Sequence, residues 1–242
     1  MFPSRPAATL LAAGLAVIAA VGLGPATRAA QAPAPAAVSE PRLPGIDRVV
    51  EAAIAAGQTP GAVILVGRGD RIVHLQAYGV RALVPAREAM TVDTVFDLAS
   101  LTKVVATTTA VMSLVEQGRI RLNDAVAAHV PGFERYGKGR ITVGHLLTHV
   151  SGLRPDVDLA DPWDGYDTAI ELASNEVPVA PPGERFIYSD INFFLLGEIV
   201  RTVSGQRLED YTRETIFQPL GMRDTGFLPP QALLPRIAPT ER

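Results

Sequence analysis

One short stretch, Asp97-Leu-Ala-Ser100-Leu-Thr-Lys103-Val-Val-Ala, constrains this chain more than any other. Its pattern predicts a buried turn that runs into a helix, with Ser100 at the helix start and Lys103 one turn later. Residues three apart lie on the same helix face, so both side chains can point into one site. The fold must therefore present the N-terminus of an apolar helix where a serine and a lysine can act together.

The lysine at position 103 is informative because lysine is rare here. The chain has 22 Lys and Arg residues, of which only Lys103 and Lys138 are lysines. Arginine stays protonated in proteins, whereas a desolvated lysine can lose its proton and act as a base. A serine hydroxyl needs such a neighbour to become a nucleophile, and a helix N-terminus favours negative charge on Ser100. The alternative is a plain helix cap beside a solvated lysine, which the apolar residues around the pair disfavour.

The N-terminal region predicts export. Residues 1–30 combine a positive charge at Arg5, an apolar run and small residues near position 30, which is typical of a signal peptide. An uncleaved membrane anchor is the alternative, but the apolar run is short for a span. We therefore expect a secreted or periplasmic protein with no membrane span in its mature chain. Residues 31–44 are rich in Ala and Pro and predict an extended linker before a domain at 45–242.

The composition excludes several function classes. The absence of cysteine excludes disulfides and a lipid-modified N-terminal cysteine, and the net charge of −3 does not indicate nucleic-acid binding. His145 and His149 are four residues apart, but Leu146 stands where the usual zinc-protease motif needs a glutamate. We expect both histidines to be structural, with no metal and no cofactor.

Hydrophobic periodicity predicts a mixture of helices and strands. Two strands joined by a hairpin turn are expected at 62–66 and 72–78. Helices are expected near 46–56, 100–116, 142–149, 191–203 and 208–217, with Thr142 as a cap. Loops are expected over 85–93, 153–167 and from 223 to the C-terminus.

Three motifs, in this order, resemble those of one family. Ser100-Leu-Thr-Lys103, Leu146-Leu-Thr-His-Val-Ser-Gly152 and Tyr188-Ser-Asp190 are similar to motifs of the penicillin-recognising serine hydrolases. These include class C β-lactamases, D-alanyl-D-alanine carboxypeptidases and related esterases, and the resemblance covers roughly residues 45–227. It implies an α+β fold of the β-lactamase/transpeptidase type, with an antiparallel sheet flanked by helices and a helical subdomain.

The resemblance also implies roles for single residues. Ser100 is then the nucleophile, Lys103 the base or the group that tunes the base, and Tyr188 the proton shuttle, because a lysine cation stabilises a nearby phenolate. Asp190 stands where the family has Asn, and Asn192 follows two residues later; we assign both to substrate binding. An ionised Asp only accepts hydrogen bonds, so Asp190 would hold Lys103 as a cation, which favours ester hydrolysis over β-lactam hydrolysis.

The family's third motif, a C-terminal strand with Lys-Thr-Gly or a basic-x-Gly variant, has no counterpart in this sequence. Lys138-Gly139 precedes the second motif and so has the wrong order. We therefore expect the C-terminal strands of the sheet to be missing and the domain at 45–242 to be incomplete at its C-terminus. Two hypotheses follow. The first is an exported serine hydrolase that forms an acyl-enzyme with an ester, an amide or a D-Ala-type peptide. The second is an inactive remnant or ligand-binding module of the same fold.

Overall fold

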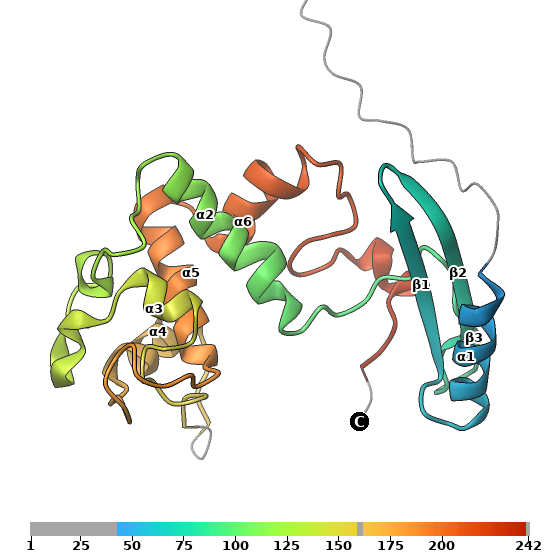
Figure 1. Ribbon diagram of the computed structural model, residues 1–242, viewed down its shortest axis with the longest axis horizontal. Coiled ribbons are helices and arrows are strands. Elements are labelled where there is room, and N and C mark those ends of the chain that lie inside the picture. The colour runs from blue at the N-terminus through green and yellow to red at the C-terminus, as the bar shows by residue number, and fades with distance from the viewer. Residues whose placement is uncertain (1–42, 159–161, 241–242) are drawn as a thin grey trace, which may run out of the picture. The chain divides into compact units, whose positions relative to one another are not determined.

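The described structure combines helices with one small antiparallel sheet, which confirms the predicted α+β class (Figure 1). This computed structural model describes residues 43–158 and 162–240. The predicted signal peptide, residues 1–30, and residues 31–42 of the predicted linker lie outside the described residues. Within the described ranges, no helix is long and apolar enough to cross a membrane.

The sheet is a hairpin with a short third strand. Strand β1, Gly61–Arg68, pairs antiparallel with β2, Arg71–Ala82, which confirms the predicted hairpin. A two-residue strand β3, Glu88–Ala89, pairs with the other edge of β2. The prediction of a loop over 85–93 is wrong for the two residues of β3. A strand this short is too brief to show the alternation of polar and apolar residues by which strands are predicted.

Helix α1, Pro44–Ala55, contacts β2 partly through polar groups. The Tyr78 hydroxyl of β2 donates to Asp47 of α1 and lies 2.9 Å from His74 Nε2. Pro44, which the sequence analysis places in the linker, is the first residue of α1. A proline is favourable there, because an N–H at the first helical position has no partner within the helix.

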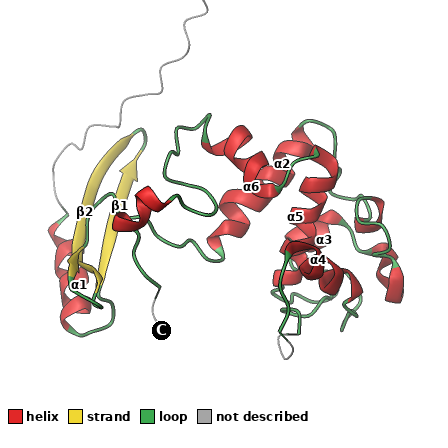
Figure 2. Ribbon diagram, turned by 180° about the vertical axis from the view of Figure 1, so that it is seen from behind, coloured by secondary structure: helices red, strands yellow, loops and turns green. Residues whose placement is uncertain are grey.

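Helix α5, Asp190–Ser204, is the centre of the helical core (Figure 2). It contacts four other α-helices and the π-helical segment Lys103–Thr108, which confirms the prediction of an apolar helix buried on most sides. These helices are α2, Thr109–Glu116; α3, Val143–Leu147; α4, Tyr166–Asn175; and α6, Leu208–Thr212. Its fully buried apolar residues are Ile191, Leu195, Leu196, Ile199 and Val200.

A buried carboxylate ties α4 to α5. Glu198 accepts a hydrogen bond of 2.7 Å from the Tyr166 hydroxyl and two from the Arg201 guanidinium, at 2.6 and 2.7 Å. Burial acts to raise the pKa of Glu198, but the hydrogen bonds from Arg201 and Tyr166 outweigh it and leave the pKa lowered. The ionised carboxylate therefore stabilises the packing of these two helices.

The structure corrects two predicted loops. Tyr166 and Asp167 belong to α4, and residues Gln231–Arg236 near the C-terminus form a 3₁₀ turn. Helix α4 lacks a side-chain N-cap and buries only Ala173 fully, so its sequence carries a weak helical pattern. The remaining short turns are 3₁₀ segments at Val126–Ala128 and Arg135–Arg140 and π-helical segments at Lys103–Thr108 and Arg213–Phe217.

Candidate active site

Ser100 lies at the tip of an unusual turn. The preceding residue, Ala99, has φ +43°, and its N–H donates to the Asp97 carboxylate at 2.8 Å. A non-glycine residue in this left-handed region is uncommon and is often found at functional sites. The sequence predicts a buried turn, but residues 97–101 are exposed. The turn thus presents Ser100 at the surface.

The helix that follows Ser100 begins with a widened turn. Residues Lys103–Thr108 are π-helical, and the Thr109 hydroxyl donates to the Val104 carbonyl five residues back at 3.0 Å. Such π segments occur frequently at functional sites. One helix face packs in the core and the opposite face, with Val104 63% exposed, does not. The residues on the face that packs in the core are Ala106, Ala110, Val111 and Leu114.

Lys103 is the hub of the site. Its Nζ donates to Ser100 Oγ at 3.1 Å and forms an ion pair with Asp190 Oδ1 at 2.6 Å. The same Nζ lies 5.1 Å from the centroid of the Tyr188 ring and 5.7 Å from that of Phe193, within the range of cation–π attraction. The structure therefore brings four of the five residues predicted from the sequence together around one ammonium group.

The charges in this cluster set the protonation states. Burial acts to lower the pKa of Lys103, but hydrogen bonds and charge interactions with Asp190 and Tyr188 outweigh it and leave the pKa raised. Hydrogen bonds from Ser100 and Lys103 lower the pKa of the Tyr188 phenol, against burial and the charge of Asp190. The lysine is thus stabilised as a cation and the phenol is stabilised as a phenolate.

Backbone hydrogen bonds hold the Tyr188 segment against the motif Leu146–Gly152. The N–H groups of Gly183 and Ile187 donate to the carbonyls of Val150 and His149, both at 2.8 Å. Gly152 has φ +81°, and its carbonyl accepts the Val179 N–H at 2.8 Å. A Cβ at this glycine would collide with the Ala180 carbonyl group. The glycine of the motif is therefore needed for a close approach of two backbone segments.

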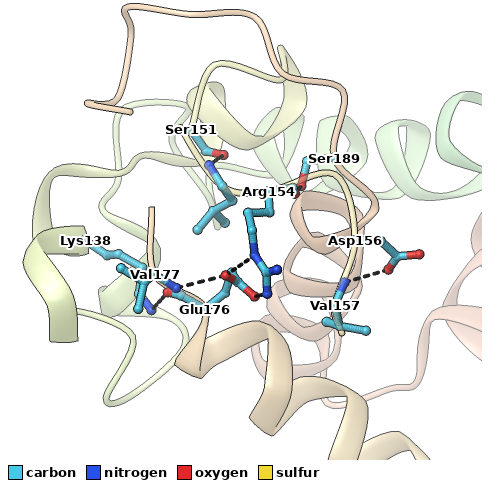
Figure 3. A network of polar contacts seen from close by, with 9 residues as sticks. Lys138, Ser151, Arg154, Asp156, Val157, Glu176, Val177 and Ser189 are labelled. Carbon is cyan, nitrogen blue, oxygen red and sulfur yellow. Dashed lines mark hydrogen bonds and ion pairs between the residues drawn. The ribbon is translucent and has the colours of Figure 1, made fainter. Parts of the chain in front are cut away.

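A second brace comes from a polar network around Arg154 (Figure 3). Its guanidinium makes two hydrogen bonds to the Glu176 carboxylate, at 2.6 and 2.8 Å, and its carbonyl accepts the Ser189 hydroxyl at 2.6 Å. Lys138, which is fully buried, donates to the carbonyls of Ser174 and Glu176 at 2.6 and 2.7 Å. The network fixes the residue that follows Tyr188.

The structure places Asn192, which the sequence analysis assigns to substrate binding, in the core. Its side chain is fully buried, accepts the Ser151 hydroxyl at 2.7 Å and donates to the Leu146 carbonyl at 3.1 Å. Residues two apart on a helix point to different faces, so Asn192 cannot share the face of Asp190. Asn192 instead links α5 to the motif segment.

His149 is the residue at the site whose position sequence reasoning missed. Its ring stacks on Tyr188 with 4.5 Å between ring centroids, and its Nδ1 accepts the Ser189 N–H at 3.0 Å. His145 differs, because its Nδ1 accepts the Thr142 N–H and completes the helix cap of α3. In residues 43–158 and 162–240, no group of three or more His, Asp or Glu side chains could hold a metal ion.

Comparisons with known proteins identify relatives of this chain. The chain is 34% identical over 212 residues to an N-acetylmuramyl-L-alanine amidase of Bacillus subtilis (strain 168), which covers 80% of this chain and 48% of the amidase. It is 31% identical over 226 residues to a protein of Salmonella schwarzengrund (strain CVM19633) provisionally named D-alanyl-D-alanine carboxypeptidase, covering 83% of this chain and 51% of that protein. The chain thus spans about half the length of the curated relatives it matches.

Solved structures share the fold. A penicillin-binding protein homologue from Caulobacter crescentus superposes with a TM-score of 0.73 at 28% sequence identity, covering 85% of this chain and 56% of that one. Such neighbours confirm the predicted β-lactamase/transpeptidase-like fold. The family model for beta-lactamase matches residues 46–242, nearly all of the predicted domain. The chain therefore belongs to the beta-lactamase family.

Proposed function

We propose that this chain is an exported serine hydrolase that forms an acyl-enzyme at Ser100. The observation that carries the proposal is the hydrogen bond of 3.1 Å between Lys103 Nζ and Ser100 Oγ, beside a phenol whose pKa Ser100 and Lys103 lower. A serine needs an adjacent base to become a nucleophile, and a stabilised phenolate at Tyr188 is such a base. Export rests on the pattern of residues 1–30 alone.

The lowered pKa of Tyr188 supports this residue as the base in the proton steps. The Tyr188 phenolate removes the proton from Ser100 as Oγ attacks the substrate carbonyl, and the phenol then returns that proton to the leaving group. Water attacks the acyl-enzyme by the same route, with Tyr188 again accepting and returning a proton. Lys103 remains a cation throughout, because Asp190 lies 2.6 Å from its Nζ. Its charge stabilises the phenolate and the negative charge that develops at Oγ.

The backbone N–H of Ser100 supplies one donor for the oxyanion. No hydrogen bond within the described ranges uses this N–H, and it lies at the start of the helical segment. One donor of an oxyanion hole contributes about 10²–10³ in rate, so the efficiency of the site depends on what else contacts the substrate oxygen. Substrates with a good leaving group depend least on stabilisation of the oxyanion.

The substrate class that we propose is an ester, an amide or a D-Ala-type peptide. Relatives named as an amidase and as a carboxypeptidase support a carbonyl substrate of this type. Asp190 stands at the position where the family has an asparagine, and its carboxylate differs in chemistry from that amide. Because its carboxylate accepts hydrogen bonds and repels a substrate carboxylate, it favours an uncharged ester over a substrate with a free carboxylate.

A second candidate function is a ligand-binding module without turnover. The ion pair between Asp190 and Lys103 favours it, because a lysine held as a cation is not itself a base. This candidate predicts saturable binding with no product formed. The hydrolase predicts multiple turnovers that depend on Ser100 and Tyr188.

Hydrolysis of a nitrophenyl ester by the 242-residue chain separates the two candidates. We expect product release with wild type, none above background with Ser100→Ala, and a loss of about 10²–10⁴-fold with Tyr188→Phe, the usual contribution of a positioned acid–base group. If Ser100→Ala hydrolyses the ester as fast as wild type, the assignment is wrong.

Substitutions of Lys103 test whether it acts as a cation or as a base. Lys103→Arg keeps a positive charge but cannot lose its proton, whereas Lys103→Met keeps only the approximate length of the side chain. We expect the arginine variant to retain more activity than the methionine variant. Equal, complete loss in both would indicate that Lys103 must itself accept a proton.

A further inference from the structure

The conformation of His149 is unusual for a residue treated as structural. It follows α3, is 9% exposed and has φ +57°, in the left-handed region that non-glycine residues rarely occupy. Such a backbone conformation persists only where surrounding contacts hold it. The contacts of His149 therefore indicate what this conformation achieves.

Three contacts of His149 converge on the segment 187–189. Its carbonyl accepts the Ile187 N–H at 2.8 Å and its Nδ1 accepts the Ser189 N–H at 3.0 Å. Between these two anchors, its ring stacks on the Tyr188 ring, with 4.5 Å between centroids and 28° between planes. One residue thus fixes the backbone on both sides of Tyr188 and also the face of its ring.

The Nδ1 contact specifies the protonation state of His149. A ring nitrogen that accepts from a backbone N–H carries no hydrogen, so the imidazole is neutral with its proton on Nε2. Protonation would place a hydrogen on Nδ1 that faces the Ser189 N–H, and the two donors would repel each other. The contact therefore exists only for the neutral ring.

The charged surroundings also favour the neutral ring. The titratable groups that face His149 are Lys103, Tyr188 and Asp190, while Phe186 and Phe193 cover the rest of the ring, 5.8 and 5.2 Å between centroids. Burial and the positive charge of Lys103 lower the pKa of His149, partly opposed by Asp190. Around neutral pH the residue is thus uncharged.

We propose that His149 is the positioning residue for Tyr188, and that its protonation releases Tyr188 from Ser100 and Lys103 and so suppresses acylation at acid pH. The inference rests on the proposed function, since it assigns to Tyr188 the role of base. His149 does not touch the reacting atoms; it acts through the orientation of the phenol. A misplacement of about 1 Å at a reacting group can cost roughly 10²-fold in rate, so a positioning residue has a measurable effect.

The chain offers a matched set of variants. His149→Asn tolerates a positive φ and keeps an acceptor for the Ser189 N–H, but it has no ring and cannot be protonated. His149→Phe keeps a ring but has no acceptor. His145→Asn is the control, because His145 lies in α3 four residues before His149, and its Nδ1 likewise accepts a backbone N–H, that of Thr142.

The first readout needs no catalysis. The ionisation of Tyr188 is followed by ultraviolet difference titration of each variant against the same variant with Tyr188→Phe. We expect the pKa of Tyr188 to rise toward its ordinary value of 10.0 in both His149 variants and to stay lowered in wild type and His145→Asn. Unchanged titration of Tyr188 in both folded His149 variants would overturn the proposal.

The second readout is the pH dependence of the reaction of Ser100 with a fluorophosphonate, in which Oγ attacks phosphorus and displaces fluoride. At a pH below the pKa values of both Tyr188 and His149, a plot of the logarithm of the rate against pH should have a slope of two in wild type. In His149→Asn the slope should be one, because only Tyr188 then takes up a proton. His149→Asn should also react with the fluorophosphonate about 10–100-fold more slowly than wild type at neutral pH, as expected for a displaced base. A slope of one in wild type over this whole range would contradict the proposal.

The two readouts separate failure of this inference from failure of the proposed function. If wild type does not react with the fluorophosphonate at any pH, the hydrolase assignment fails, but the titration of Tyr188 still tests the role of His149. If the His149 variants do not fold, nuclear magnetic resonance of wild type replaces them. The ring signals of Tyr188 should then shift with the same midpoint as those of His149, and independence of the two would overturn the proposal.

Discussion

The close approach of the backbone at Gly152 leads to a sharp prediction for Gly152→Ala. This glycine has φ +81°, and a Cβ there would lie 2.9 Å from the Ala180 carbonyl carbon and closer still to its oxygen. Its own carbonyl accepts the Val179 N–H at 2.8 Å. An alanine can be accommodated only if the 149–152 segment and the 179–187 segment move apart.

The cost has two parts. A left-handed conformation costs an alanine roughly 1–2 kcal/mol relative to glycine. Separation of the segments weakens the hydrogen bond from Val179, worth about 0.5–1.5 kcal/mol, and forces strain on its neighbours. We expect Gly152→Ala to lower the free energy of unfolding by about 2–4 kcal/mol, a large effect for a single substitution.

Gly205 is the matched control for this measurement. It has φ +79°, almost the same as Gly152, but a Cβ there meets nothing within 4 Å. Gly205→Ala should therefore cost only the conformational part, roughly 1–2 kcal/mol. Urea unfolding followed by circular dichroism gives both values. If the two variants lose the same stability, the close approach at Gly152 does not constrain the fold and this reasoning is refuted.

Three further predictions concern charge and burial. Asp190→Asn should move both limbs of the pH–rate profile to lower pH, because this carboxylate acts to raise the pKa values of both Lys103 and Tyr188. Glu198→Gln should lower stability near neutral pH by about 1–3 kcal/mol. That difference should shrink as the pH falls below 4.5, because the folded-state pKa of Glu198 is lowered and its contribution is lost on protonation. Asn192→Leu should destabilise the fold by about 1–3 kcal/mol, because it leaves the buried Ser151 hydroxyl without its acceptor.

Each of these predictions has an outcome that would contradict it. A profile of Asp190→Asn that moves to higher pH would mean that the carboxylate does not act on Lys103 as the ion pair indicates. Acid unfolding of Glu198→Gln that parallels wild type would exclude ionisation of Glu198 as a source of stability. Wild-type stability in Asn192→Leu would mean that the buried hydrogen bonds of Asn192 do not stabilise the fold.

The features that sequence analysis predicted correctly depend on neighbours along the chain. Ser100 and Lys103 meet because they are three positions apart at the start of a helix, and α5 follows from an apolar pattern bounded by Ser189 and Gly205. The hairpin of β1 and β2 follows from alternation and turn residues in the same way. Tyr188 could be placed beside Ser100 only through the resemblance of its motif, since 85 residues separate it from Lys103.

The features that were missed depend on contacts between distant segments. Strand β3 and helix α4 have weak patterns of their own, and the π-helical turn after Ser100 has no signature in its residues. The burial of Asn192 could have been expected from helix periodicity, because it lies two residues after Asp190 and so points to a different face of α5. His149 stacks on Tyr188 with its backbone in the left-handed region. A histidine in a sequence gives no sign that its backbone adopts this conformation.

Identification of the serine that a fluorophosphonate modifies tests the central claim most directly. The full chain is treated with a fluorophosphonate, digested and analysed by mass spectrometry. We predict a single adduct on Ser100, which is absent from Ser100→Ala and forms much more slowly in Lys103→Met. An adduct at another serine, or equal labelling of Ser100→Ala, would contradict the claim that Ser100 and Lys103 form the reactive centre of this protein.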